Sequence, residues 1–267
     1  MKNNSDNINY CSTINKNKSI SCFTKEQIIN MLNKIQRKMK KKIIINEKNS
    51  KKKLYEQLLK ELNCKDDYCI SNYNQIFDET NFNLILKPKL KNGKYGPISN
   101  LDINKIMLQF ENKYPDFIYL GTSPANFKEL FFDEYYNMNF NKYKKQKKCI
   151  GMVINTEGLP SSGQHWITLF IDFREKIPEI KFFDSLGKKP QTEIIDYINY
   201  IKKELNGNVN VSYNKNKYQR YGNNCGVYGI YFIQKNIEKD LNEKIFKTYF
   251  NDKKMNDIRE SYYNTRL

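Results

Sequence analysis

The shortage of histidine is the most informative property of this sequence. Its 267 residues contain one histidine, His165, and one tryptophan, Trp166, and the two are neighbours in SSGQHWITLFIDF. An enzyme that needs an imidazole can therefore use only His165. No apolar run approaches the roughly 20 residues that cross a bilayer, and the N-terminus MKNNSDNINYCSTIN has no apolar signal core. We expect a soluble protein of a cytosol-like compartment without a membrane span.

The cysteines form no regular framework. With one histidine in the chain, a structural zinc site would have to be built almost entirely from thiolates. We therefore expect scattered reduced thiols rather than disulfides, and neither a metal nor a cofactor. The six cysteines are Cys11, Cys22, Cys64, Cys69, Cys149 and Cys225.

The positive charge is concentrated at the N-terminal end. Of a net charge of +17, residues 1–53 contribute fourteen Lys and Arg against three Asp and Glu, a net +11. This gradient indicates an acidic partner for the N-terminal part, such as nucleic acid, an anionic membrane surface or an acidic protein. The alternative is a compositional bias, because Lys, Asn, Ile and Tyr are abundant along the whole chain.

Two amphipathic helices are predicted in this basic segment. Thr24 to Gln27 form a capping box, and Phe23 and Ile28 are spaced as a hydrophobic staple. Apolar residues at helical spacing then predict a helix over about 25–41 and a second over about 50–62. Joined by IIINEKN, they resemble the helix-extension-helix of SAP-like DNA-binding modules.

A second region follows the linker LKPKLKNGKYGP at residues 86–97. We place the domain boundary between residues 83 and 84, with a basic helical arm at 1–83 and a core at 84–267. In the core, strands at CIGMVIN, HWITLFIDF, EIKFFDS and VNVSYN alternate with helices. This pattern predicts an α+β domain of roughly 180 residues.

His165 and Asp184 are predicted to meet across a hairpin. A turn at residues 174–178 centres the hairpin near residue 176, with position 165 opposite 187 and position 168 opposite 184. Asp172 is excluded because it lies about 23 Å along the strand from His165 and on the opposite face. The alternative role for Asp184 is that of a turn residue at a strand end.

Cys225 is the candidate nucleophile. It follows Gly222-Asn223-Asn224, which offers an N-cap, and precedes the apolar run VYGIYFI of a buried helix. The first turn of such a helix carries unpaired N–H groups and the positive end of the helix dipole, which favours a thiolate and offers half of an oxyanion hole. Gln219 can supply a second donor from the preceding loop. The alternative is a small core cysteine.

His165-Trp166, Asp184, and Gln219 six residues before Cys225-Gly226 together resemble the SUMO-protease and adenain-like cysteine proteases. With the predicted N-terminal helical arm, the chain looks most like the polyprotein-processing proteases of large DNA viruses, the African swine fever virus type. The resemblance covers residues 97–267. It implies an α+β core with a mixed sheet and a buried helix that carries the cysteine.

The resemblance also implies a substrate site. It places Trp166 against a narrow channel for a Gly-containing peptide, with Gly222 and Asn224 also at the substrate. Asn224 stands where cellular SUMO proteases usually have Asp, and the tryptophan that those enzymes carry near their first core helix is absent. This departure speaks against a tunnel that clamps SUMO.

The resulting hypothesis is a cysteine endopeptidase that cuts viral structural polyproteins after Gly-Gly-like or Gly-X-Gly-like sequences during virion maturation. It would act in the host cytoplasm and the virion. His165 is the general base and acid, Asp184 orients it, and Gln219 helps to hold the oxyanion. A deSUMOylase or deubiquitinase with the same chemistry is the first alternative, and a basic binding protein with a relic triad is the second.

Overall fold

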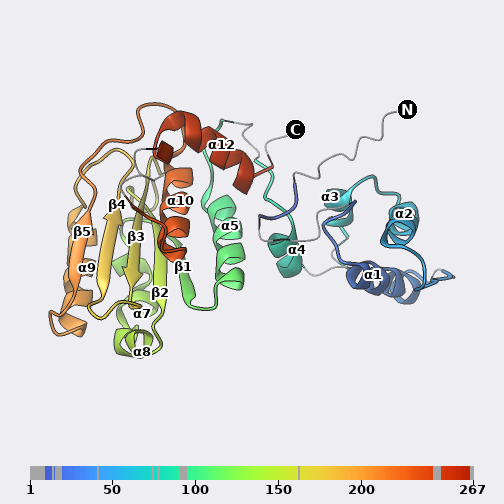
Figure 1. Cartoon of the computed structure of the whole chain (residues 1–267), viewed down its shortest axis with the longest axis horizontal. Coiled ribbons are helices and arrows are strands. Elements are labelled where there is room, and N and C mark those ends of the chain that lie inside the picture. Colours follow the sequence, from blue (N-terminus) through green and yellow to red (C-terminus); the bar gives the residue numbers. More distant parts are fainter. Residues whose placement is uncertain are drawn as a thin grey trace. The chain divides into compact units, whose positions relative to one another are not determined.

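The computed structural model describes residues 10–13, 15, 20–40, 42–73, 75–76, 79–90, 95–161, 163–242 and 248–264. It divides into two compact units, which are labelled by element in Figure 1. The first comprises Met1–Pro88 with Tyr262–Asn264, and the second Lys89–Ser261 with Thr265–Leu267. The domain boundary before residue 84, and the folding of residues 84–267 without the arm, stay predictions. Among the described residues, no helix is long and apolar enough to cross a membrane.

The first unit is a small helical bundle. Its helices are α1 (Lys25–Lys38), α2 (Lys51–Leu62), α3 (Asp67–Ile70) and α4 (Glu79–Ile85). The predicted capping box is present, because the Thr24 side chain accepts from Gln27 N and the Gln27 side chain accepts from Thr24 N. The first helix ends at Lys38, three residues earlier than expected, and Lys41 lies outside the described residues.

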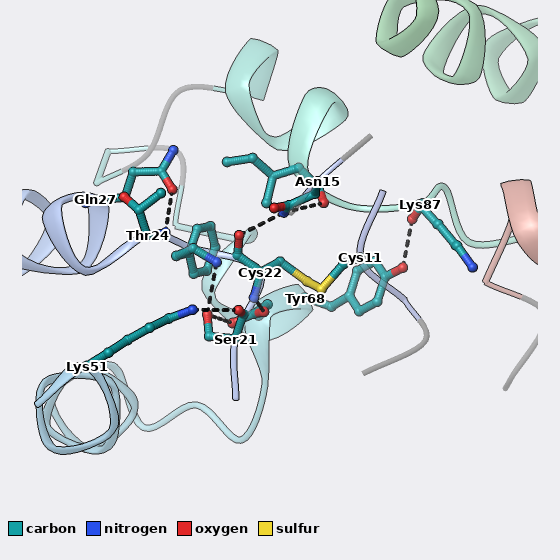
Figure 2. Close-up of a disulfide and its surroundings, with 12 residues drawn as sticks. Cys11, Asn15, Ser21, Cys22, Thr24, Gln27, Lys51, Tyr68 and Lys87 are labelled. Carbon is teal, nitrogen blue, oxygen red and sulfur yellow. Dashed lines mark hydrogen bonds between the residues drawn. A yellow bond between two sulfur atoms is a disulfide. The ribbon is translucent and has the colours of Figure 1, made fainter. Parts of the chain in front are cut away.

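Two disulfides in this unit correct the expectation of reduced thiols. Cys11 bonds to Cys22, as Figure 2 shows, and Cys64 bonds to Cys69. The expectation failed because it used spacing alone, whereas the fold brings both pairs to a Cα separation of 5.4 Å, which suits a disulfide. Cys149 and Cys225 are free.

The second unit is built on one mixed sheet of five strands in the order β1-β2-β3-β4-β5. The central three strands are antiparallel, while β1 runs parallel to β2 and β5 runs parallel to β4. The expected α+β fold with a mixed sheet is therefore confirmed. The strands are β1 (Phe117–Ser123), β2 (Cys149–Asn155), β3 (Trp166–Asp172), β4 (Glu179–Phe183) and β5 (Asn210–Tyr213).

Helices cover both faces of this sheet. On one face α10 (Cys225–Ile237) packs on β3, and α5 (Asn100–Lys113) packs on β1 and α10. On the other, alternate residues of β2, β3 and β4 join α9 (Thr192–Glu204) in a buried apolar cluster. Among the described residues, the unit also contains α6 (Phe127–Leu130), α7 (Phe132–Tyr136), α8 (Phe140–Lys145) and α12 (Asp252–Tyr262).

The register of the β3–β4 hairpin differs by one residue from the prediction. Thr168 pairs with Phe183 rather than with Asp184. The observed register pairs Ile171 with the equally buried Ile180, whereas the predicted one pairs it with Lys181. Because paired residues share a face, matching of apolar faces determines the register. His165 still precedes β3 and Asp184 still follows β4.

Candidate active site

The ends of two adjacent strands bring His165 and Asp184 together. His165 Nε2 lies 2.7 Å from Asp184 Oδ1, and their side chains are 13% and 3% exposed. The same Oδ1 accepts the N–H of Leu186 at 2.7 Å. This carboxylate therefore has a fixed orientation and can hold the imidazole in one position.

Cys225 also interacts with His165 and favours its protonated form. Because Nε2 faces Asp184, Nδ1 is the ring nitrogen left for the thiol. Burial by itself lowers the pKa of His165, but the hydrogen bonds to Asp184 and then to Cys225 outweigh it and raise the pKa to about 9. The site thus favours an imidazolium between a carboxylate and a sulfur.

Cys225 is the first residue of α10, as the sequence predicted. This helix can lie close to the sheet because Gly229 faces β3, where a Cβ would come within 2.5 Å of Thr168 Oγ1. A Cβ at Gly226 would likewise come within 2.6 Å of Ile98 Cδ1. These two glycines allow the close packing that sets the position of the thiol.

The Asn224 side chain does not form the N-cap that its position offers, and its expected role at the substrate stays a prediction. It occupies the N-cap position of α10 but makes no side-chain cap bond. Its Oδ1 accepts from Arg259 Nη1 at 2.9 Å, and its Nδ2 donates to Asn256 Oδ1 at 2.7 Å. The buried side chain is directed toward α12, and it does not line the cavity that Cys225 lines.

The Gln219 side chain is held at both ends. Its Oε1 accepts from Ser185 Oγ at 2.7 Å, and its Nε2 donates to the Gly222 carbonyl at 2.8 Å. An amide nitrogen carries two N–H groups, and the second is not used in a hydrogen bond among the residues that the structure describes. Ser185 was not identified from the sequence.

Asn214 is a second residue that sequence reasoning missed. Its Oδ1 accepts the Asp184 N–H at 2.9 Å, and its Nδ2 donates to the Asp184 carbonyl at 2.7 Å. The Asn214 side chain thus holds the backbone of Asp184, the carboxylate that pairs with His165, through both its N–H and its carbonyl. Its position just after β5 was the only available signal, and nothing local links it to a residue thirty positions earlier.

The candidate catalytic side chains line one cavity of about 1000 Å³. Trp166 forms part of its wall and donates Nε1–H to the Ile98 carbonyl at 3.2 Å. Tyr221 is 66% exposed beside it. Of the residues expected at the substrate, Trp166 and Gly222 line the cavity, and their binding role stays a prediction. The predicted catalytic residues that line it are His165, Asp184, Gln219 and Cys225.

Asp172, which was excluded as the carboxylate that orients His165, pairs with Arg174 instead. Its two carboxylate oxygens accept hydrogen bonds from Nε and Nη2 of Arg174, at 2.8 and 2.7 Å. Burial raises the pKa of Asp172, but these hydrogen bonds outweigh burial and hold the pKa below its ordinary value. Within the described part of the chain, no cluster of three or more His, Cys, Asp or Glu could hold a metal ion.

A buried helix that presents a cysteine to a histidine–carboxylate pair is the arrangement of a thiol hydrolase. A family model described as the Ulp1 protease family, C-terminal catalytic domain, matches residues 123–266, which is more than half of the chain. The chain belongs to this family, in agreement with the resemblance found in its motifs.

Viral proteins are among the relatives. A thiol protease of Acanthamoeba polyphaga mimivirus is 29% identical over 171 residues, covering 62% of this chain and 56% of the relative. A SUMO-1 cysteine protease of African swine fever virus is 21% identical over 181 residues, covering 61% and 66%. The match thus spans little more than half of the first relative.

The same likeness is visible in three dimensions. The crystal structure of an African swine fever virus protease superposes with a TM-score of 0.67 at 19% identity, covering 95% of each chain. At this identity the superposition establishes the fold and not the substrate.

Proposed function

We propose that this chain is a cysteine endopeptidase that cleaves after Gly-Gly-like or Gly-X-Gly-like sequences. The observation that carries the proposal is the 2.7 Å contact between His165 and Asp184, in the cavity that Cys225 also lines. Three groups of the required types and order line one cavity, although they are separated by nineteen and by forty-one positions in the chain.

In this mechanism the thiolate of Cys225 attacks the scissile carbonyl carbon while His165 holds the proton. The carbonyl electrons move to the oxygen, which receives N–H groups from the Cys225 backbone and from Gln219 Nε2. His165 then protonates the leaving amine as the C–N bond breaks, which leaves a thioester. Water, deprotonated by His165, attacks the thioester and restores the thiolate and the imidazolium.

The preference for glycine follows from crowding beside Cys225. Trp166 is fixed through Ile98, and the Ile98 side chain packs against Gly226, the residue after the nucleophile. Substrate residues next to the scissile bond would have to pass the Trp166 ring, which favours residues without a Cβ. Enlarging this passage by Trp166→Ala should therefore raise the relative rate on Ala-containing peptides.

A peptide panel tests the proposal. The full chain is incubated with peptides that differ only at the two residues before the scissile bond, and the products are identified by mass spectrometry. We expect cleavage after Gly-Gly or Gly-X-Gly and none with Cys225→Ala. Cleavage by Cys225→Ala, or no preference for glycine, would contradict the proposal.

A deSUMOylase or deubiquitinase is the second candidate. The name SUMO-1 cysteine protease, carried by the relative from African swine fever virus, favours it. The measurement that separates the two compares kcat/KM for a folded ubiquitin-like fusion with kcat/KM for a peptide of the same terminal sequence. A large advantage of the folded fusion would establish this alternative.

The natural substrate that we propose is a viral structural polyprotein, processed during virion maturation in the host cytoplasm and in the virion. The viral origin of the relatives supports this assignment. Infection with virus that carries Cys225→Ala should accumulate uncleaved precursor in particles. Normal processing in that virus would exclude the role.

The arm is proposed to bind nucleic acid or another polyanion. The end of α1 and the loop after it expose cations, and Ile44 among them is 84% exposed. Exposed basic side chains gathered in this way suit the phosphate backbone of a nucleic acid or another polyanion. The four exposed cations proposed to make the contacts are Arg37, Lys38, Lys40 and Lys42.

Mobility-shift titrations at two salt concentrations test this binding. Neutralising the four cations together should reduce affinity and lower the salt slope by up to about four, because each phosphate contact contributes about one. The matched control removes four lysines of the α8 region instead. If the control loses as much affinity as the arm variant, the arm does not bind specifically. The control residues are Lys142, Lys144, Lys145 and Lys147.

A further inference from the structure

We propose that Ser185 is a positioning residue that orients the Gln219 amide toward the developing oxyanion. This inference rests on the proposed function, since it concerns the second donor of that oxyanion site. Ser185 directly follows Asp184, the carboxylate that pairs with His165, and it is 1% exposed. The same short turn after β4 therefore holds two parts of the site.

The hydrogen bonds fix which end of the amide is nitrogen. The Gly222 carbonyl can only accept, so the group 2.8 Å from it is Nε2. The other end is then Oε1, and Ser185 Oγ must donate to it across 2.7 Å. With both ends held, the remaining Nε2–H has one direction. A donor that is already oriented stabilises an oxyanion without reorganising.

The Ser185 hydroxyl is not needed to hold the loop. The Ser185 carbonyl accepts the backbone N–H groups of Tyr218 and Gln219, both at 2.9 Å. Any residue at position 185 can keep these two bonds. Removing the hydroxyl should therefore leave the backbone of Gln219 in place and release only its side chain. This separation of backbone and side-chain contacts makes the proposed role testable.

The first experiment is a double-mutant cycle with Ser185→Ala and Gln219→Ala in the full chain. We expect Gln219→Ala to lower kcat by roughly 10²–10³ and Ser185→Ala to lower it by about tenfold, with KM nearly unchanged. In the Gln219→Ala background, Ser185→Ala should change kcat less than about twofold, because its effect passes through the missing amide.

Tyr197→Phe is the matched control. It removes a different buried hydroxyl, which donates to the Tyr135 carbonyl within the α9 layer. Any loss of stability that follows from deleting a buried hydroxyl should appear in both variants, whereas the loss of kcat should appear only in Ser185→Ala. Multiplicative effects in the cycle, or a higher KM at unchanged kcat, would overturn the proposal.

The second readout does not depend on cleavage. Side-chain amide NMR signals of Gln219, assigned by their absence in Gln219→Ala, should move in Ser185→Ala and stay in place in Tyr197→Phe. Unmoved signals in Ser185→Ala would refute the inference even if the enzyme is active. Failure of the wild-type chain to cleave any peptide would instead remove the proposed function, and the NMR result would still decide the orienting role.

Discussion

Replacing Asp184 with asparagine should shift the pH dependence of cleavage. The substitution keeps the shape of the side chain but removes the charge 2.7 Å from His165 Nε2. In the wild type, burial opposes the imidazolium, while the bonds to Asp184 and Cys225 raise the pKa of His165 to about 9. Without the carboxylate, burial still lowers the pKa of His165, while one of the interactions that raise this pKa is lost. The pKa of His165 must therefore fall.

The expected size follows from the same contacts. The difference between about 9 and the ordinary 6.5 corresponds to about 3 kcal/mol in favour of the imidazolium. Because the folded-state pKa is raised, this stabilisation is fully present below pH 6.5 and is lost as the pH rises through 9. Removing an adjacent opposite charge should lower the pKa of His165 by roughly one to three units.

The assay is kcat/KM for a Gly-Gly peptide from pH 5 to 10. The descending limb should lie near pH 9 in the wild type and move to lower pH in Asp184→Asn, with a maximal rate lower by roughly 10²–10⁴. Asp172→Asn is the control, because its carboxylate is buried but bonded to Arg174, and its limb should not move. If the descending limb of kcat/KM lay at the same pH in the wild type, Asp184→Asn and Asp172→Asn, the assignment of Asp184 would be refuted.

Three further results are expected. Cys225→Ser and His165→Ala should each abolish cleavage while leaving the melting temperature near that of the wild type, and turnover by His165→Ala without added imidazole would exclude the triad. Gly229→Ala should lower the free energy of unfolding by about 1–3 kcal/mol, since its Cβ would meet Thr168 Oγ1 at 2.5 Å; an unchanged urea midpoint would contradict this. Deletion of residues 1–83 should leave a cooperatively folding core by calorimetry, and a molten product would show that the arm is required.

The sequence was sufficient for the strands, the helix of Cys225 and the central pair of the site because each depends on a local or a unique feature. His165 is the single histidine, so no choice had to be made among imidazoles. A hairpin with a short turn brings the residues before and after it together whatever its precise register. The contact between His165 and Asp184 was therefore predicted correctly, although the predicted pairing of β3 with β4 was wrong by one residue.

The parts that the sequence did not reveal depend on contacts between distant segments. Cys11 reaches Cys22 because the chain beside Cys11 is held by a segment more than seventy residues later. In this contact the N–H of Ser12 donates to the Ile85 carbonyl. Spacing carries no information about such a contact. Asn214 is equally hidden, since its two bonds to the Asp184 backbone arise only when β5 joins the edge of β4.

Asn224 shows why local chemistry alone can mislead at a functional loop. An asparagine just before a helix is a good N-cap, and no neighbouring residue argues against that role. Arg259, thirty-five residues later on α12, donates to its Oδ1 and also to the carbonyls of Asn223 and Gly96. A buried guanidinium with five donors needs several acceptors, and it takes the cap oxygen as one of them. The loop before Cys225 is thus held by α12, and the first N–H groups of α10 receive no side-chain oxygen from Asn224. In the proposed mechanism, this leaves the backbone N–H of Cys225 for the oxyanion of a bound substrate.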